Sequence, residues 1–348
     1  MAKIKRSDSV KLLSLDLGFS SIKLAYINND GDLRYEKFVS GIAKLPEPPL
    51  DMGDETTCFQ FNGNYFIIGN ESLNVPKSYL LNLEDYNQLK ESYPPILSFL
   101  LNKFQNSGLI FDKIIIGLSL AFKDKADELL SYIYSEMMWN PEDNRVICLP
   151  QGLSGKVSYN EYGLSLRERS TEAKLLSYLL VDIGSLTIDI ANVNAGGKTT
   201  GGAMGYPNTG VIVIARNIQE YLFKAFEIKV SIKEALSILD NEGDFTKRGK
   251  RYDISDKIDE FCIRYLSDVL KLIEDKYGED LDVVSGIVVI GGGAYILQKY
   301  KNTDTMKKEI EKHFSPSFLH VPENDGEYYN CNSYLRIVQK WLDEGKLS

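Results

Sequence analysis

Two segments of the chain carry an acidic residue and a glycine at the same spacing. Each is an apolar run that ends in Asp-x-Gly and continues into a second run: LSLDLGFSSIKLAY at 13–26 and LLVDIGSLTIDIAN at 179–192. Asp16 and Asp182 supply carboxylates, while Gly18 and Gly184 permit backbone angles that aim N–H groups outward. The repeat predicts two similar half-domains that face one phosphate group, with a polyphosphate and its metal ion held between them.

A glycine turn in the second half of the chain is the third segment that could contact a ligand. The segment GIVVIGGGAYIL, residues 286–297, predicts a buried strand, a turn and the start of a helix. Gly291, Gly292 and Gly293 have no side chains, so a base or a sugar-phosphate can lie directly on the backbone near a helix N-terminus that favours negative charge. Tight packing of a helix on a sheet explains a Gly-Gly-Gly turn about equally well.

The elements that must position these motifs form a mixed α/β pattern. Asp30-Gly31 and Asn62-Gly63 predict hairpin turns, and Pro94-Pro95 predicts a break in the first long helix. An apolar stripe at 258–273 predicts a helix that faces the core, and the final helix is predicted to pack back onto the first half-domain. Strands are expected at 12–17, 22–28, 32–38, 113–120 and 145–150, and helices at 83–104 and 124–138.

Length and composition restrict the class of protein. The chain has 348 residues, about twice the usual size of one domain, which predicts two domains. Lys plus Arg number 40 against 49 Asp plus Glu, a net charge of -9, which argues against direct binding to nucleic acid or to anionic lipid. Two histidines and four cysteines without a CxxC pair argue against a histidine metal site and against disulfides. Neither a signal peptide nor a membrane span is predicted, so a cytoplasmic protein is expected.

The three motifs, in this order, resemble those of the actin-like ATPases, the superfold shared by actin, sugar kinases and heat-shock chaperones. DLGFSSIK, 16–23, resembles the first phosphate loop, with Asp16, Gly18 and Lys23 at the family spacing Asp-x-Gly-x4-Lys. DIGSLTID, 182–189, resembles the second phosphate loop, and VIGGGA, 289–294, resembles the adenosine motif. Within the superfamily the chain is most similar to the bacterial ParM/StbA branch of plasmid-segregating filaments. That assignment uses the size of the chain and LPQG at 149–152, GYPNTG at 205–210 and YNCNSY at 329–334.

The resemblance implies an actin-like ATPase fold (ribonuclease H-like) whose two similar α/β domains flank a nucleotide cleft. Domain I would span 1–178, with an inserted subdomain at about 36–105 and completion by a C-terminal helix at 328–348; domain II would span 179–327. The implied nucleotide-binding residues are Asp16, Gly18, Phe19, Ser20, Ser21, Lys23, Gly184, Ser185, Leu186, Thr187, Gly210, Gly291, Gly292, Gly293 and Ala294.

Hydrolysis of a γ-phosphate needs charge neutralisation and an oriented water rather than covalent chemistry. Asp16 and Asp182 are the expected ligands of a hydrated Mg²⁺, which meets only one or two carboxylates. Lys23 should reach the β- and γ-phosphates, and hydroxyls from both loops can donate to phosphate oxygens. Gln151 cannot take up a proton near neutrality, so it would orient the attacking water, while Asp189 would accept from that water or orient its neighbours. Slow turnover is expected.

Several of these residues also have a simpler structural interpretation. Asp189 occupies an alternating strand position and could be an exposed strand residue. Gln151 follows a proline and could be a turn residue. The basic run at 247–251 in an acidic chain is more often a solvated loop than a nucleic-acid site, and the proline-rich loop at 44–54 is more often a surface loop than a subunit contact.

Two positions depart from the family pattern. Ser185-Leu186 follow Gly184 where Asp-x-Gly-Gly-x-Thr is common, and Ser333 stands where a glycine is expected. The first change would alter one backbone contact to phosphate.

The resemblance therefore predicts an actin-like filament-forming protein that binds ATP, with GTP as the alternative, together with Mg²⁺. It would hydrolyse the nucleotide slowly, assemble head to tail with copies of itself, and move DNA through an adaptor of the ParR type, without binding DNA or membrane directly. The alternatives are a small-molecule (sugar or acid) kinase of the same superfold, or a nucleotide-binding scaffold that does not hydrolyse.

Overall fold

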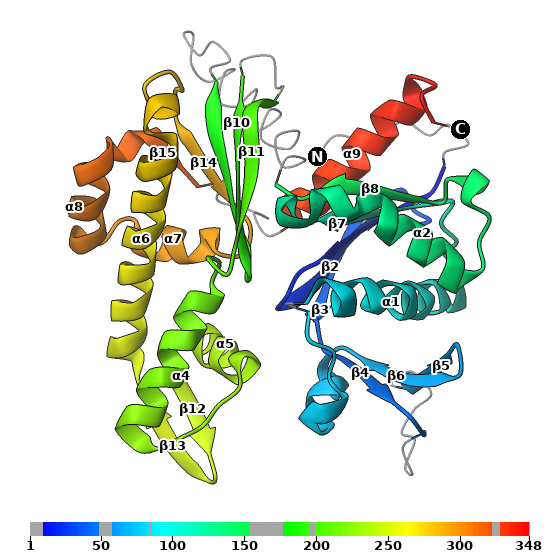
Figure 1. Cartoon of the computed structure of the whole chain (residues 1–348), viewed down its shortest axis with the longest axis horizontal. Helices are drawn as coiled ribbons and strands as arrows, with labels where there is room; N and C mark the ends of the chain where they lie inside the picture. The colour runs from blue at the N-terminus through cyan, green and yellow to red at the C-terminus, as the bar shows by residue number, and fades with distance from the viewer. Residues whose placement is uncertain are drawn as a thin grey trace. The chain divides into compact units, whose positions relative to one another are not determined.

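The computed structural model describes residues 10–48, 58–83, 85–152, 177–194, 199–321 and 328–347. The chain divides into two compact units (Figure 1): unit 1 contains Met1–Ser154 and Asn330–Ser348, and unit 2 contains Gly155–Tyr329. The sequence-based boundaries were 178/179 and 327/328, and the stretches 153–176 and 322–327 next to them lie outside the described residues.

Unit 1 is built on a five-stranded sheet in the order β3-β2-β1-β7-β8. The first three strands pair antiparallel, and β1, β7 and β8 run parallel. The strands are β1 (Leu12–Leu17), β2 (Ser21–Ile27), β3 (Leu33–Val39), β7 (Lys113–Leu118) and β8 (Val146–Pro150). All six residues of β1 are buried, because both faces of this central strand are covered.

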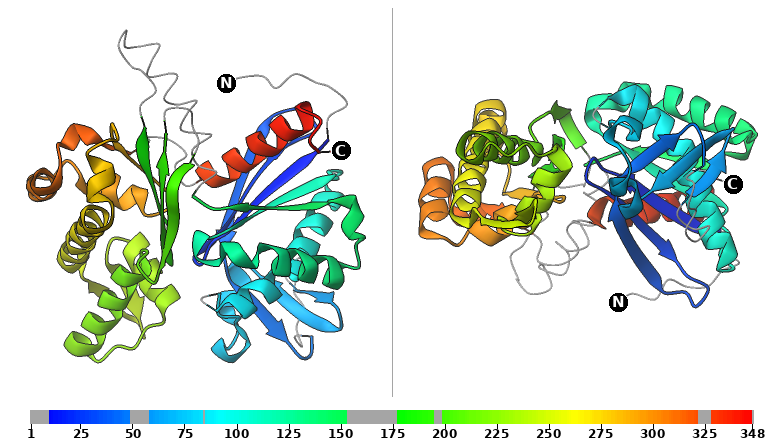
Figure 2. Two further views of the ribbon diagram at one scale, coloured as in Figure 1. Left: turned by 45° about the horizontal axis from the view of Figure 1, so that its top comes forward. Right: turned by 90° about the horizontal axis from the view of Figure 1, so that it is seen from below.

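Different helices cover the two faces of this sheet (Figure 2). On one face Leu13 and Leu15 join a core with α1 (Tyr86–Asn106) and α2 (Ala126–Met137). On the other face Leu12 and Ile115 join a smaller core with α9 (Tyr329–Asp343). The predicted packing of the last helix on the strands of the first half is confirmed.

Helix α1 runs through Pro94 and Pro95, so the predicted break at these prolines is wrong. Each proline removes one helical hydrogen bond, at a cost of about 3 kcal/mol. Buried side chains of the same helix offset this loss: Tyr93 donates from its hydroxyl to the carbonyl of Gly117 at 2.7 Å, and Ile96 and Leu97 are fully buried. Tertiary packing therefore outweighs the local preference.

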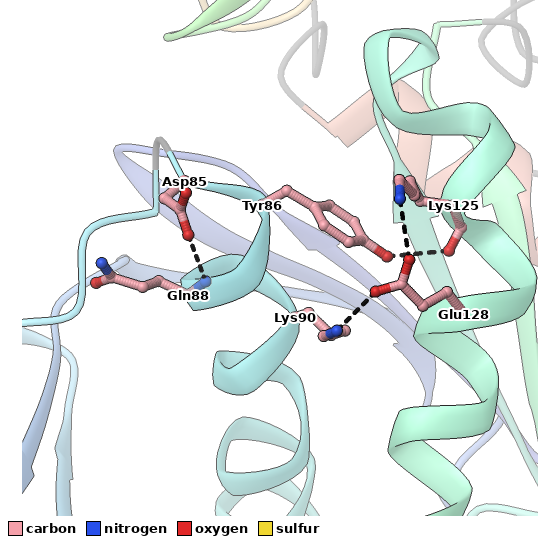
Figure 3. A network of polar contacts seen from close by, with 6 residues as sticks. All are labelled: Asp85, Tyr86, Gln88, Lys90, Lys125 and Glu128. Atoms are coloured by element: carbon pink, nitrogen blue, oxygen red, sulfur yellow. Dashed lines mark hydrogen bonds and ion pairs between the residues drawn. The ribbon is translucent and has the colours of Figure 1, made fainter.

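Polar contacts at the start of α1 fix it to α2 (Figure 3). The carboxylate of Asp85 accepts from the N–H of Gln88 at 3.1 Å and so caps the helix. Glu128 of α2 binds the ammonium groups of Lys90 at 2.6 Å and of Lys125 at 3.2 Å. These bonds lower the pKa of the Glu128 carboxyl.

A small sheet in the order β4-β6-β5 completes unit 1. Its strands are β4 (Ile42–Leu45), β5 (Cys58–Phe61) and β6 (Asn64–Ile68). Asn62 and Gly63 have φ values of 45° and 77°, which confirms the hairpin turn predicted from the Asn-Gly pair.

Unit 2 repeats the sheet of unit 1. Its strands follow the order β11-β10-β9-β14-β15, again with three antiparallel strands followed by two parallel ones. The strands are β9 (Tyr178–Ile183), β10 (Thr187–Val193), β11 (Thr199–Pro207), β14 (Ile287–Ile290) and β15 (Leu319–His320). Strand β9 therefore holds the place of β1, and Asp182 holds the place of Asp16, each one residue before the end of its strand.

The predicted core-facing stripe at 258–273 lies in the longest helix, α6, and its apolar residues are buried as expected.

The basic run at 247–251 forms the turn of the hairpin β12–β13. Lys247 binds Glu234 at 2.5 Å and Arg251 binds Asp244 at 2.5 Å, so two of its four charges are already neutralised. The elements are α4 (Ile212–Phe226), α5 (Ile232–Asp240), β12 (Asp244–Lys247), β13 (Lys250–Asp253), α6 (Ser255–Leu281), α7 (Ala294–Tyr300) and α8 (Asp304–His313).

The described residues also include five short 3₁₀ helices: Asn70–Asn74, Lys77–Tyr79, Leu120–Lys125, Pro141–Asp143 and Pro316–Phe318. Among the helices that the structure describes, none combines the length and the apolar character needed to cross a bilayer.

Candidate functional site

The first candidate half-site lies at one end of the unit 1 sheet. Asp16 is 5% exposed and stands directly opposite Lys23 in the antiparallel pairing of β1 and β2. Gln151 follows β8, where its N–H donates to the carbonyl of Leu118 at 2.8 Å. Because β1, β7 and β8 are parallel, their carboxyl ends share one edge, which is where ligands bind in sheets of this kind.

Gln151 and Asp16, separated by 135 residues in sequence, are bonded to each other. The Nε2 amide group of Gln151 donates to Oδ1 of Asp16 at 2.5 Å. Gln151 is therefore more than a residue of the turn after Pro150. Burial raises the pKa of the Asp16 carboxyl, and the charge of Lys23 and the amides of Gln151 and Asn330 oppose that rise.

Asn330 is a site residue that the motif analysis did not assign to the site. It lies at the start of α9, is 7% exposed, and its Oδ1 accepts from the N–H of Gly152 at 3.2 Å. Its side chain also forms a hydrogen bond with Asp16. The YNCNSY segment was used only for the resemblance, and its Asn residues at 330 and 332 were the available signal.

The first predicted phosphate loop is a tight turn. The N–H of Gly18 donates to the carbonyl of Ser21 at 3.0 Å, and a Cβ at Gly18 would stand 3.0 Å from that same oxygen. A Cβ at Gly184 would stand 3.1 Å from the carbonyl oxygen of Thr187, so both turns are tight around their glycines. The N–H of Gly184 donates to that carbonyl at 2.9 Å, so the N–H groups of Gly18 and Gly184 are bonded within their turns and are not aimed outward as predicted; neither glycine has a positive φ. Ser40 donates its hydroxyl to the Gly18 carbonyl at 2.5 Å, and Phe19 packs against the core. Ser20 is half-buried beside Ser21, which is 7% exposed.

The second half-site pairs two buried carboxylates in unit 2. Asp182 in β9 and Asp189 in β10 are direct partners in the antiparallel register and are 5% and 3% exposed. The reading of Asp189 as an exposed strand residue is therefore wrong. The hydroxyl of Thr187 donates to Oδ2 of Asp189 at 3.5 Å, at the limit of a hydrogen bond.

The turn between β9 and β10 packs on the start of α4. The N–H of Gly210 donates to the carbonyl of Leu186 at 3.1 Å, and the N–H of Ile212 donates to that of Ser185 at 2.8 Å. A Cβ at Gly210 would lie 2.5 Å from the carbonyl oxygen of Gly184, so only glycine fits there. The loop carbonyls occupy the first N–H groups of α4, which fixes the loop that carries the predicted phosphate contacts.

The glycine turn after β14 lies against Asp182. Gly291 has φ +87°, and a Cβ there would stand 2.1 Å from Oδ1 of Asp182. The N–H of Gly293 donates to the carbonyl of Ile183 at 2.8 Å, and a Cβ on Gly293 would collide with the Ile183 side chain. A Cβ at Gly292 would meet no atom within 4 Å. The turn thus combines two packed glycines with one that faces open space.

The helix after this turn contributes less than the sequence suggested. Helix α7 begins at Ala294, which is buried, and has only seven residues. A helix of two turns carries a weak dipole, so the exposed backbone of Gly292 is the better candidate contact for a ligand.

The carboxylates suit a hydrated divalent cation better than a fully coordinated one. Within the described residues, no group of three or more His, Cys, Asp or Glu side chains could hold a metal ion. Mg²⁺ typically keeps several waters and takes its remaining ligands from one or two carboxylates and from phosphate. Each unit holds a buried carboxylate of this kind, Asp16 in unit 1 and Asp182 in unit 2.

Comparison with known proteins supports an actin-like assignment. Residues 180–301 match the family model of the archaeal actin homologue MreB-like C-terminal domain. In structure, the chain is similar to a ParM from a 15-stranded filament of Clostridium botulinum, with a TM-score of 0.67, 16% identity, and coverage of 95% of this chain and 99% of that chain. The chain has the actin-like fold. The predicted fold class is confirmed, and the match over residues 180–301 agrees with the predicted resemblance to actin-like proteins.

Two further relatives extend the comparison. The archaeal actin homolog Ta0583 in complex with ADP has a TM-score of 0.67 and 16% identity, with coverage of 95% of this chain and 99% of that one. MreB5 of Spiroplasma citri bound to ADP has a TM-score of 0.62 and 13% identity, with coverage of 97% and 99%. A search of curated proteins finds no match.

Proposed function

We propose that this actin-like chain binds ATP with Mg²⁺, assembles into filaments in the triphosphate state and hydrolyses the nucleotide slowly. The observation that carries the proposal is the duplicated sheet, in which Asp16 and Asp182 hold the same place in their units. Each unit thus supplies one buried carboxylate, one residue before the end of its strand and next to a tight turn, and a carboxylate in that place suits the hydrated cation that accompanies a nucleotide.

In this proposal Lys23 neutralises phosphate charge. Hydroxyl and backbone N–H groups of the residues that follow Gly18 and Gly184 donate to phosphate oxygens, since the N–H groups of the two glycines are bonded within their turns. Mg²⁺, when bound, would withdraw charge from the β- and γ-phosphates. Gln151 uses its amide NH₂ to bind Asp16, which leaves its carbonyl oxygen able to accept from the attacking water. Because an amide cannot remove the proton, water is oriented rather than deprotonated, and slow turnover follows.

Self-assembly and the DNA-segregating role draw on the relatives. The similar ParM was solved as a filament and the archaeal homolog with ADP. By extension we propose head-to-tail assembly of this chain. We also propose that it moves plasmid DNA through an adaptor of the ParR type, since the net charge of -9 disfavours direct contact with DNA.

Negative-stain electron microscopy with a non-hydrolysable ATP analogue, with ADP and without nucleotide tests assembly, beside phosphate release with ATP and with GTP. We expect filaments only with the triphosphate, and slow phosphate release. Gln151→Ala should still assemble but release phosphate about 100-fold more slowly, a loss typical of removing one hydrogen-bonding group at a reacting centre. Turnover only after a sugar or acid is added, without filaments, would instead indicate a kinase. Nucleotide binding without any turnover would indicate a scaffold.

A further inference from the structure

The first residues of α9 contact the strands that carry the predicted phosphate-binding groups. The thiol of Cys331 donates to the carbonyl of Lys23 at 3.3 Å, and the hydroxyl of Tyr35 on β3 donates to Oδ1 of Asn332 at 2.7 Å. Asn330, one residue before Cys331, makes the contacts that reach the candidate site. One turn of helix near the C-terminus therefore lies against the hairpin formed near the N-terminus.

The side-chain amide of Asn330 connects two separate parts of the half-site. Its Oδ1 accepts from the N–H of Gly152 at 3.2 Å, directly after Gln151. Since its oxygen faces that donor, the NH₂ group is the end that donates to the Asp16 carboxylate. Asp16 also accepts from Gln151 at 2.5 Å, so two amides from different elements donate to one buried carboxylate.

This arrangement restricts the carboxylate more than either amide could alone. Two donors from different elements fix the rotation of the Asp16 side chain, and therefore fix which oxygen lone pairs remain for a cation. The bond to Gly152 holds the backbone next to Gln151 at the same time. An aspartate at position 330 would instead face Asp16 with a second negative charge, and an alanine would leave both partners without this bond.

We propose that Asn330 is a positioning residue that orients the Asp16 carboxylate for the magnesium ion of a bound nucleotide. This inference rests on the proposed function. Asn330 acts through Asp16 and does not itself touch phosphate. It contributes to the affinity for the cation that accompanies the nucleotide, and contributes little to the affinity for the nucleotide without a cation.

The test compares Asn330→Ala with Asn332→Ala in the full chain. Both remove an asparagine from the same helical turn, but Asn332 binds Tyr35 and not Asp16. Mn²⁺ binding in the presence of ADP is measured by electron paramagnetic resonance, and ADP binding in EDTA by calorimetry. Loss of a residue that orients a metal ligand weakens metal affinity by about 10- to 100-fold. We expect a Mn²⁺ dissociation constant at least about 10-fold higher in Asn330→Ala, with ADP binding in EDTA within about twofold of wild type.

The possible outcomes distinguish failure of the role of Asn330 from failure of the proposed function. If wild type binds no ADP under either condition, the proposed function fails. If wild type binds ADP and Mn²⁺, and Asn330→Ala matches it, only the role of Asn330 is overturned. Equal weakening of Mn²⁺ and EDTA-state ADP binding in Asn330→Ala, or the same losses in Asn332→Ala, would show a structural role and also overturn it. A thermal unfolding curve of each nucleotide-free variant identifies a variant that has not folded.

Discussion

At the scale of single residues, the glycine turn depends on the absence of one side chain. Gly291 combines φ +87° with a hypothetical Cβ 2.1 Å from Oδ1 of Asp182. Gly291→Ala should therefore lower the free energy of unfolding by about 2–3 kcal/mol, through backbone strain and overpacking. It should also weaken nucleotide binding, because Asp182 must move. Urea unfolding and calorimetry with ADP measure the two effects.

Gly292 provides the matched control for that substitution. It is the next residue, and a Cβ there would meet no atom within 4 Å. Gly292→Ala should change the free energy of unfolding by less than about 1 kcal/mol. Equal losses in the free energy of unfolding for the two substitutions would contradict the assigned packing of this turn on Asp182.

Some residues of the candidate site could be predicted from the sequence, and others could not. Asp16, Lys23 and Asp182 were recognisable because their spacing reflects one local hairpin, and the pairing of strands then places them. Asn330 was not recognised, because its partners lie 178 residues and more away along the chain. Only the folded chain brings those partners together. The sequence left Asp189 as either a catalytic residue or an exposed strand residue. In the structure it lies opposite Asp182 and is buried.

At the scale of elements, one ion pair couples a helix to a hairpin in unit 2. The Glu234 side chain accepts from the N–H of Ser231 at the start of α5 and binds Lys247 of β12 at 2.5 Å. Burial of the Glu234 carboxyl opposes ionisation, but the bonds from Lys247 and Ser231 prevail and lower its pKa to about 2. The ionised form is therefore favoured in the folded state.

The sign of the pH dependence follows from that lowered pKa. The ionised Glu234 carboxylate stabilises the folded state fully above its ordinary pKa of 4.5, and this stabilisation is lost as the pH falls toward about 2. Glu234→Gln should lower the free energy of unfolding at pH 6 by about 1 kcal/mol at most, since the pair is partly exposed and screened. The difference from wild type should shrink below pH 4.5 in urea titrations. Glu279→Gln, at an exposed position of α6, should show no such convergence.

The elements themselves were largely predictable where periodicity and turn chemistry agreed. The Asn62-Gly63 hairpin and the apolar stripe of α6 are examples. Helix α1 was misjudged because Pro94 and Pro95 are strong local breakers, while the packing of Tyr93 and Ile96 is a tertiary effect. Sequence patterns report local preference, and the buried face of a helix can override it.

At the scale of the whole molecule, the repeated topology gives each unit one carboxylate in an equivalent place, and the proposed function requires both. A ligand at 100 times its dissociation constant stabilises the folded state by about 2.7 kcal/mol. For units of this size we expect the unfolding temperature to rise by about 5–10 °C with ATP analogue and Mg²⁺. Asp16→Asn in unit 1 and Asp182→Asn in unit 2 should each remove most of that rise, because either change removes a carboxylate that Mg²⁺ requires.

An exposed turn residue supplies the control for both variants. Asp30→Asn, in the Asp-Gly turn between β2 and β3, should keep the full rise in unfolding temperature, since asparagine suits the same turn. If Asp16→Asn abolished the rise and Asp182→Asn left it intact, or the reverse, one unit alone would hold the nucleotide. The similarity of the two sheets would then reflect a duplication that kept the fold while only one copy kept the phosphate site.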